Sequence, residues 1–248
     1  MSGTRDWDAG TYHRVSDVHT EWAEQVLGRL PAAGSGTVLD AGCGSGRVTA
    51  MLLDRCEHVV AVDAAPSMVA HARETLGDRA TVFQANLLDL ELDEPVDAIF
   101  SNAVFHWVPD HPRLFSRLHA ALKPGGALEA QYGGYGNVQR FHEAADEVAA
   151  DEPFAEHLGG WVGPWNFTSD EQARGWLSDA GFVDVSAWLE TWPMRPREPR
   201  EYIRSVCLGH HLERLPEELR VPYVDAVADR MAPEIDYVRL NISARRAA

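Results

Sequence analysis

The stretch that decides the fold is residues 37–46, Thr-Val-Leu-Asp-Ala-Gly-Cys-Gly-Ser-Gly. A short apolar run leads into a loop with glycine at every second position, and apolar residues then recur at helical spacing. This order predicts a buried strand, a tight turn and the start of a helix. Because Gly42, Gly44 and Gly46 have no Cβ, they leave bare peptide groups against which a nucleotide-like ligand can lie. We expect the unpaired N–H groups of the following helix to face that ligand.

The spacing of the glycines distinguishes between two kinds of ligand. A dinucleotide fingerprint needs a third glycine three residues after the second, and the two possible registers place Arg47 or Thr49 there. Asp40 instead precedes the first glycine, and this D-x-G-x-G-x-G pattern resembles motif I of the class I methyltransferases that use S-adenosyl-L-methionine (SAM). SAM has no pyrophosphate but carries an ammonium group, which the Asp40 carboxylate can hold directly or through water. A purely structural glycine turn is the alternative.

Polar residues follow the next two predicted strands. Residues 58–63 read as a buried strand ending in Asp63, which lies about 20 residues past the glycine loop, where an acid accepts hydrogen bonds from ribose hydroxyls. After the third predicted strand, residues 80–85, comes Asn86. The methyltransferase resemblance implies an acceptor of the adenine amino group here, commonly an aspartate, and asparagine keeps a carbonyl acceptor. Leu87 either sandwiches the purine or fills the core.

The segment after the fourth predicted strand, residues 96–100, carries the closest family resemblance. SNAVFHWVPDHPRLFSRL (101–118), followed by LKPGGALEAQYGG (122–134), resembles the trans-aconitate methyltransferase group of small-molecule enzymes. Ligands of open parallel sheets bind outside the carboxyl ends of the strands, where the strand order reverses, so we expect residues 101–107 to face the reacting methyl group. Together with the preceding motifs, the resemblance implies a donor site made of Tyr12, Asp40, Gly42, Cys43, Gly44, Gly46, Asp63, Ala64, Asn86, Leu87 and Ser101.

The resemblance also implies a small-molecule methyl acceptor beside His106. This histidine either removes a proton from the acceptor as a general base or forms a hydrogen bond without moving a proton. Trp107 is expected to be a wall of the acceptor pocket, and Tyr132 and Trp165 are further candidates for contact with the acceptor. An acidic acceptor would meet arginine, and the candidates in the predicted roof are Arg195, Arg197, Arg204 and Arg239. No His or carboxylate spacing suits a metal, so we predict no metal site.

The predicted fold is a Rossmann-like α/β domain. The methyltransferase resemblance implies a mostly parallel seven-stranded sheet in the order 3-2-1-4-5-7-6, with the last strand antiparallel, helices on both faces and a helical lid. Residues 1–135 would form an N-terminal helix, at about 16–30, and the SAM-binding core, in which a turn at 123–126 precedes strand five. Residues 136–248 would supply lid inserts and strands six and seven of the same domain. We expect the insert at 198–231 to be helical, with breaks near Pro216 and Pro222.

Length, charge and cysteine content argue against several classes of protein. A chain of 248 residues can form one ample domain, and a formal charge of −16 argues against nucleic-acid binding. Three irregularly spaced cysteines suggest neither a disulfide framework nor a zinc site. With no apolar signal region and no run long enough to span a membrane, we expect a cytoplasmic monomer or homodimer with a small-molecule substrate.

The favoured activity is transfer of a methyl group from SAM, by in-line displacement, to an oxygen of a small carboxylic acid, leaving S-adenosyl-L-homocysteine. A natural-product O-, N- or C-methyltransferase with His106 as general base is the alternative within the same class. A SAM-binding protein without catalysis and a nicotinamide oxidoreductase are the alternatives outside it, and the glycine register disfavours the oxidoreductase.

Overall fold

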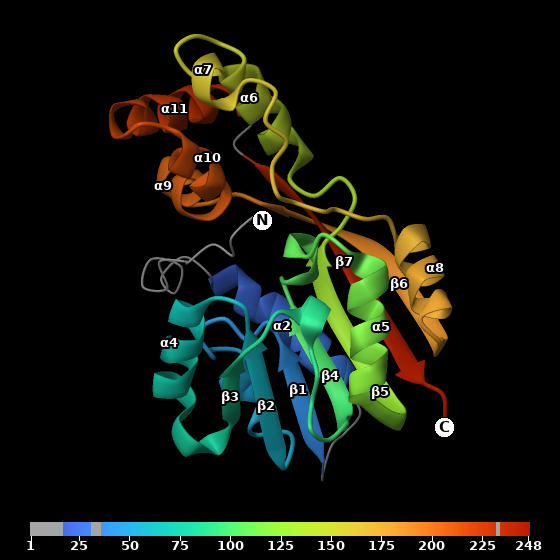
Figure 1. The fold of residues 1–248 in the computed structure, drawn as a ribbon. Helices are drawn as coiled ribbons and strands as arrows, with labels where there is room; N and C mark the ends of the chain where they lie inside the picture. Colours follow the sequence, from blue (N-terminus) through green and yellow to red (C-terminus); the bar gives the residue numbers. More distant parts are fainter. Residues whose placement is uncertain (1–16, 31–35, 232–233) are drawn as a thin grey trace. The chain divides into compact units, whose positions relative to one another are not determined.

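The computed structural model of the chain describes residues 17–30, 36–231 and 234–248. Seven strands form one sheet in the order β3-β2-β1-β4-β5-β7-β6 (Figure 1). They are β1 (Thr37–Ala41), β2 (His58–Asp63), β3 (Thr81–Gln84), β4 (Val96–Asn102), β5 (Leu122–Gly133), β6 (Phe182–Met194) and β7 (Ile235–Arg246). Strands β1 to β5 pair in parallel, and β7 is antiparallel to both β5 and β6. The predicted fold class and strand order are confirmed.

Helices occupy the connections between the strands. The longer ones are α2 (Asp17–Arg29), α4 (Pro66–Leu76), α5 (His111–Ala121), α6 (Gln139–Ala149), α8 (Asp170–Asp179) and α11 (Glu217–Arg230). The short ones are α3 (Thr49–Leu52), α7 (Ala155–Leu158), α9 (Pro199–Tyr202), α10 (Gly209–Arg214), the 3₁₀ turns η1 (Gly77–Arg79), η2 (Leu87–Asp89) and η3 (Phe105–Trp107), and the π-helical η4 (Ile203–Cys207).

The central strands are buried on both faces, because side chains alternate along a strand and helices cover each face. In β1, Val38 packs into a core shared with α2, α3 and α4. Its neighbour Leu39 points the other way, into a larger core shared with α5 and α8. Figure 1 shows α2 and α5 on opposite faces of the sheet. The short apolar run before the glycine loop is therefore a doubly covered strand.

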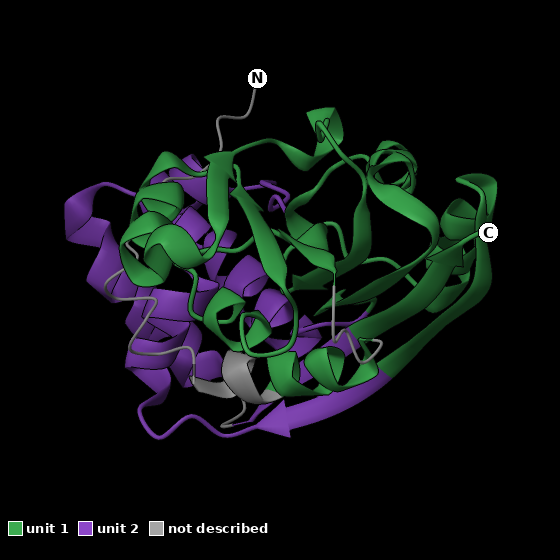
Figure 2. Ribbon diagram, turned by 90° about the horizontal axis from the view of Figure 1, so that it is seen from below, with its two compact units in different colours: residues 1–135, 166–189, 240–248 green, residues 136–165, 190–239 purple. Residues whose placement is uncertain are grey.

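The chain divides into two compact units (Figure 2). Unit 1 comprises the described parts of residues 1–135 with residues 166–189 and 240–248, and unit 2 comprises residues 136–165 with the described parts of 190–239. The chain passes from one unit to the other after residues 135, 165, 189 and 239, and the last two passages lie inside β6 and β7. The predicted division of the chain after residue 135 and the role of the second part as a lid stay predictions.

Two predictions about element boundaries were wrong. Residues 123–126 do not precede β5 but bulge within it, because Val96 pairs with Leu122 while Ala98 pairs with Ala127. The helix α11 continues through Pro222. An interior proline costs a helix about 3 kcal/mol, and α11 offsets this cost by burying Tyr223, Val224 and Val227. The predicted break near Pro216 is confirmed, because α11 begins directly after it.

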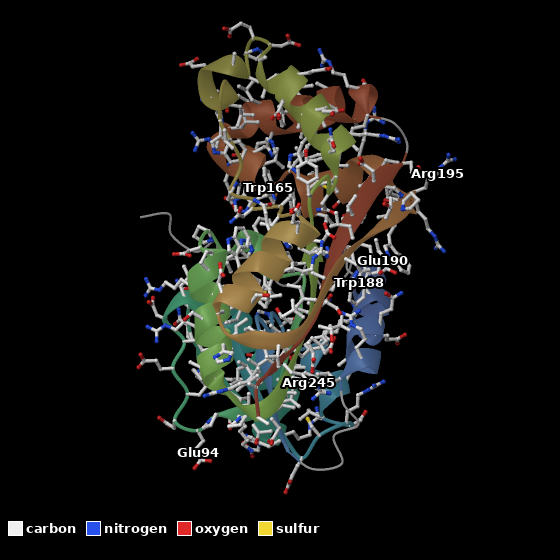
Figure 3. The ribbon with its side chains drawn as sticks, turned by 90° about the vertical axis from the view of Figure 1, so that its right-hand side faces the viewer. Glu94, Trp165, Trp188, Glu190, Arg195 and Arg245 are labelled. Carbon is white, nitrogen blue, oxygen red and sulfur yellow. The ribbon has the colours of Figure 1, made fainter. Side chains whose placement is uncertain are left out.

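A buried polar network holds α2 against the sheet. At the end of α2, Arg29 donates from Nε to Glu129 Oε2 at 3.0 Å, from Nη1 to Asn241 Oδ1 at 3.0 Å and from Nη2 to the Ala130 carbonyl at 3.1 Å. Its guanidinium also lies 5.1 Å from the ring centroid of Trp188 on β6 (Figure 3). The Glu129 side chain is 6% exposed. Burial raises the pKa of Glu129, and the Arg29 and Ser243 contacts oppose that shift.

We predict that Arg29→Met lowers the free energy of unfolding by about 3–5 kcal/mol, because it leaves the buried Glu129 carboxylate without its charge partner. Adding Glu129→Gln to that variant should restore much of the loss. Arg117→Met is the matched control, since Arg117 pairs with Glu91 at the surface, and should cost less than about 1 kcal/mol. Urea unfolding measures all three; equal losses for Arg29→Met and Arg117→Met would show that the network does not hold α2.

Candidate functional site

Asp63 ties the glycine loop to the end of β2. Its Oδ2 accepts from the Gly44 N–H at 2.9 Å, and its Oδ1 accepts from the Ala65 N–H at 2.9 Å. Burial raises the pKa of Asp63, and the amide hydrogen bonds act in the opposite direction. Each carboxylate oxygen has a second lone pair, so the side chain can still accept two hydroxyl groups from a ligand. Ala64, between these residues, accepts from Gln84 Nε2 at 3.0 Å through its carbonyl.

The N–H groups of the glycine loop are used inside the protein. Gly42 and Cys43 both donate to the Val62 carbonyl at 2.9 Å, and Gly46 donates to the Cys43 carbonyl at 3.0 Å. With Gly44 bound to Asp63, four amides of the loop point into the structure. A ligand at this loop therefore meets the peptide backbone without those donors.

The helix after the loop is a single turn. The structure gives α3 four residues, Thr49–Leu52, and the amides of Ala50 and Met51 donate to the Gly46 and Val48 carbonyls at 3.0 and 2.9 Å. The amides of Ala50 and Met51 are therefore not available to a ligand, and a one-turn helix sums few peptide dipoles. That unpaired N–H groups at the start of this helix face the ligand stays a prediction.

Gly42 and Gly44 differ in the space around the position that a Cβ atom would take. Gly42 has φ +93°, and a Cβ there would lie 2.3 Å from Val104 Cγ2, so this glycine admits the segment that follows β4. Gly44 has φ +52°, and a Cβ there would meet nothing within 4 Å. The loop is therefore closed against the protein at Gly42 and open at Gly44, where a ligand has room.

Asp40 is a buried carboxyl beneath the loop. It is 1% exposed, and Thr49 Oγ1 donates to its Oδ2 at 2.6 Å. Burial raises the pKa of Asp40 to about 7; the Thr49 hydrogen bond opposes this shift and the charge of Asp63 adds to it. Burial and the two carboxyls also raise the pKa of the Cys43 thiol, so that thiol stays protonated. The sequence analysis missed Thr49, because no motif marks it.

The other residues predicted to bind the methyl donor differ in their exposure and in their hydrogen bonds. Asn86 is exposed, and its Oδ1 accepts from the Leu88 N–H at 3.0 Å, which leaves one lone pair of that oxygen. Leu87 is 6% exposed and belongs to the core with α5. The buried Ser101 donates its hydroxyl to the Ala41 carbonyl at 2.7 Å. Tyr12 lies outside the described residues.

These side chains share one edge of the sheet. Asp40, Asp63, Asn86 and Ser101 belong to or directly follow β1, β2, β3 and β4. Those four strands are consecutive neighbours and run in parallel. Their carboxyl ends therefore meet at the same edge, as expected for a ligand site of an open parallel sheet.

His106 stands on the loop that follows β4. Ala103 has φ +62° and donates its N–H to the Gln131 carbonyl at 2.7 Å, which turns the chain into η3. His106 is 8% exposed, and its Nδ1 accepts from the Gly133 N–H at 3.3 Å. Its ring contacts those of Trp107 and Phe167, with centroids 4.8 and 5.9 Å away.

Asn166 holds the loop of His106 through three hydrogen bonds to main-chain carbonyls. Its N–H donates to the His106 carbonyl at 2.8 Å, and its side-chain Nδ2 donates to the Val108 and Pro109 carbonyls at 3.1 and 3.2 Å. No sequence pattern connects residue 166 with residue 106, so this contact could be found only in the structure. The result is a histidine whose main chain and ring are both held.

Two further predicted acceptor residues are packed against other side chains. Tyr132 has no exposed surface, and its hydroxyl lies 3.4 Å from Thr168 Oγ1; we correct its role to core packing. Trp165 belongs to unit 2, where its ring packs against His142 and His211 with centroids 4.5 and 5.6 Å away (Figure 3).

The arginines predicted to meet an acidic acceptor differ in burial. Arg195, which is 72% exposed, pairs with Glu234 at 3.6 Å and projects away from the ribbon (Figure 3). Arg204 pairs with Glu201 at 3.0 Å, and Arg197 is exposed. Arg239 is 2% exposed in unit 2. Of these four arginines, only Arg239 is buried. The side chains that contact the His106 ring are those of Trp107 and Phe167.

Metal-binding clusters and membrane-spanning helices are both absent from the described residues. Those residues contain no group of three or more His, Cys, Asp or Glu side chains that could hold a metal ion. Among the helices seen in the same residues, none has the length and apolar character needed to cross a membrane.

Comparisons with known proteins show the family of this chain. Residues 39–130 match a family described as a methyltransferase domain. A trans-aconitate 2-methyltransferase of Methylobacterium nodulans is 32% identical, over 97% of this chain and 98% of its own. One of Variovorax paradoxus is 31% identical, over 88% of this chain and 86% of its own.

The fold is also that of a solved methyltransferase. The phosphoethanolamine N-methyltransferase 2 of Haemonchus contortus, solved with SAM, has a TM-score of 0.64 and 21% identity, and the match covers all of this chain and 58% of that one. The chain uses SAM and is an enzyme. It belongs to the class I SAM-dependent methyltransferases, in the group that includes the trans-aconitate 2-methyltransferases.

Proposed function

We propose that the enzyme transfers the methyl group of SAM to a carboxylate oxygen of a small organic acid. Relatives named trans-aconitate 2-methyltransferase, about 30% identical over most of the chain, support a carboxylic acid as acceptor. A carboxylic acid has a pKa near ~4 and reaches the enzyme already ionised, so it needs no general base. The enzyme then has to align the acceptor oxygen with the methyl carbon and the sulfur, which can lower the barrier by roughly 7–11 kcal/mol.

The observation that carries the donor assignment is the chemistry of the edge formed by β1 to β4. Four amides of the loop are bound internally, and two carboxyl groups lie at this edge, that of Asp63 and that of Asp40, which is buried beneath the loop. Such an edge suits a ligand with cationic and hydroxyl groups and repels a diphosphate. SAM supplies a sulfonium methyl group that is ready for displacement.

Each residue then has a proposed role toward the donor. The free lone pairs of Asp63 accept the ribose hydroxyls, and Asn86 Oδ1 accepts from the adenine amino group. The Asp40 charge attracts the donor's ammonium group through the thin glycine loop, and Gly44 leaves room for the ligand. Cys43, Ala64 and Leu87 flank these groups, and Ser101 holds β4 to β1 at the same edge. Tyr12 remains our candidate for a cation–π contact with the sulfonium or amino-acid end.

Asp63→Asn is predicted to weaken binding of S-adenosyl-L-homocysteine by about tenfold to a hundredfold, because an amide has one acceptor oxygen where the carboxylate has two, and a lost hydrogen bond to a charged group costs about 1.5–3 kcal/mol. Isothermal titration calorimetry measures the change. The control is Asp78→Asn, at an exposed position in η1. Unchanged affinity in Asp63→Asn would remove its ribose role.

Donor binding should also depend on pH through Asp40. The pKa of this carboxyl is raised to about 7 by burial, so below that pH the group is neutral in the free enzyme and its attraction for a cation is lost. We predict that the SAM affinity falls as pH drops from 7.5 to 5.5, by up to about tenfold per unit. Asp40→Asn should bind SAM weakly at both pH values, with little pH dependence. The same slope in wild type and Asp40→Asn would assign it to another group.

The acceptor class can be tested with labelled methyl groups. Incubation with [methyl-¹⁴C]SAM and a panel of small di- and tricarboxylic acids should give products whose label is released by mild alkali, because methyl esters hydrolyse and ethers, N-methyl and C-methyl groups do not. The corresponding amides are the matched controls and should accept nothing. Alkali-stable label would contradict carboxylate methylation and favour the O-, N- or C-methyltransferase alternative.

A further inference from the structure

The hydrogen bond between Gly133 and His106 decides where the imidazole proton sits. A backbone N–H can only donate, so His106 Nδ1, 3.3 Å from the Gly133 nitrogen, must be the acceptor. A neutral imidazole has one protonated and one unprotonated nitrogen. An accepting Nδ1 therefore places the proton on Nε2.

We infer that His106 donates a hydrogen bond from Nε2–H to the acceptor carboxylate and is not the general base of the transfer. This inference rests on the proposed function, because it requires a methyl acceptor at His106. It selects between the two roles that the sequence left open. A nitrogen that already carries a proton cannot remove one, whereas it can hold an oxygen that arrives ionised.

The contact with Gly133 fixes this tautomer because the amide is buried. Gly133 lies at the end of β5 among buried residues. A proton on His106 Nδ1 would point at the Gly133 N–H, so that two donors would face each other in a site with little water. Turning the ring by half a rotation would bring a carbon atom against that amide. Both arrangements would deprive a buried N–H of this acceptor, which is unfavourable.

The surroundings keep the ring in place. Trp107 and Phe167 pack against it, at centroid distances of 4.8 and 5.9 Å. The His106 carbonyl is held by the Asn166 N–H at 2.8 Å, and the residues that follow are held by the Asn166 side chain. The orientation of Nδ1 toward β5 thus belongs to a packed loop and not to a freely rotating side chain.

A fixed Nε2–H donor selects one chemical class of acceptor. A carboxylate can accept the hydrogen bond at one oxygen while the other oxygen attacks the methyl carbon, and no proton has to be removed. An alcohol would need a base, and a protonated amine offers donors where His106 also offers one. The donor role therefore explains at atomic level why an acid would be methylated in preference to a hydroxyl or an amine.

The tautomer can be measured without an acceptor. Long-range ¹H–¹⁵N correlation spectra of the ¹⁵N-histidine-labelled enzyme report which ring nitrogen is protonated, and the His106 signals are those that disappear in His106→Gln. We expect the Nε2–H form at pH 7.5. An Nδ1–H ring, or a ring protonated at both nitrogens, would overturn the inference.

Two substitutions separate a donor from a base. Gln can place its side-chain N–H₂ near the position of Nε2, whereas Ala offers no donor. With SAM held at saturation, so that the titration of Asp40 does not enter, we expect His106→Gln to keep kcat/KM for the acceptor within about tenfold of wild type and His106→Ala to lose about a hundredfold, with flat pH profiles between 7.5 and 8.5. A general base would make both variants equally inactive and would give the wild type a rising limb that both lose.

The folded state of the variants is checked by the rise in melting temperature with S-adenosyl-L-homocysteine, which His106 should not affect. Equal inactivity of folded His106→Gln and His106→Ala would overturn the donor role. If instead the ring carries Nε2–H and the enzyme methylates only hydroxyl groups, the proposed acceptor fails while the tautomer stands, so the two failures can be told apart.

Discussion

The carboxylate of Asp63 is the constraint on which the donor edge depends. By accepting the amides of Gly44 and Ala65, it joins the loop after β1 to the turn after β2. The loop amides are thereby turned inward together with those that bind the Val62 carbonyl. What remains at the edge is bare backbone, the carboxylate of Asp63 and the carboxyl group of Asp40 buried beneath the loop. The preference for a cationic donor over a diphosphate follows from this use of main-chain hydrogen bonds, not from the glycines alone.

The loop of His106 obeys the same rule. There too a main-chain amide, that of Gly133, occupies an acceptor atom, His106 Nδ1. Only the second ring nitrogen, Nε2, is then left to interact with a ligand. Asn166 holds the loop that makes this contact possible. In both places the chemistry offered to a ligand is what remains after the backbone has been satisfied.

The sequence predicted the framework well, because the framework depends on local patterns. The strand β2, His58–Asp63, has the bounds that its apolar run and the acid at its end indicated. The strand order came from the family resemblance and was confirmed. Asp40, Asp63 and Asn86 lie at the expected sheet edge because parallel strands bring their ends together.

Other features depend on contacts between distant residues and could not be predicted. The direction of the loop amides depends on Val62 and Asp63, and the burial of Tyr132 depends on packing against Phe105 and His111. The helix α11 continues through Pro222 because the burial of Tyr223, Val224 and Val227 stabilises it. In each case tertiary packing overrides a correct local expectation.

The four passages of the chain between the two units have a consequence for recombination. Unit 2 is made of two separate segments, 136–165 and 190–239, so neither is a module that can be exchanged alone with a homologue. A chimera would have four junctions, two of them inside the continuous strands β6 and β7, where the spacing of residues cannot change without moving every side chain to the opposite face. Viable crossovers in these strands must therefore preserve register, whereas those after residues 135 and 165 tolerate changes in length.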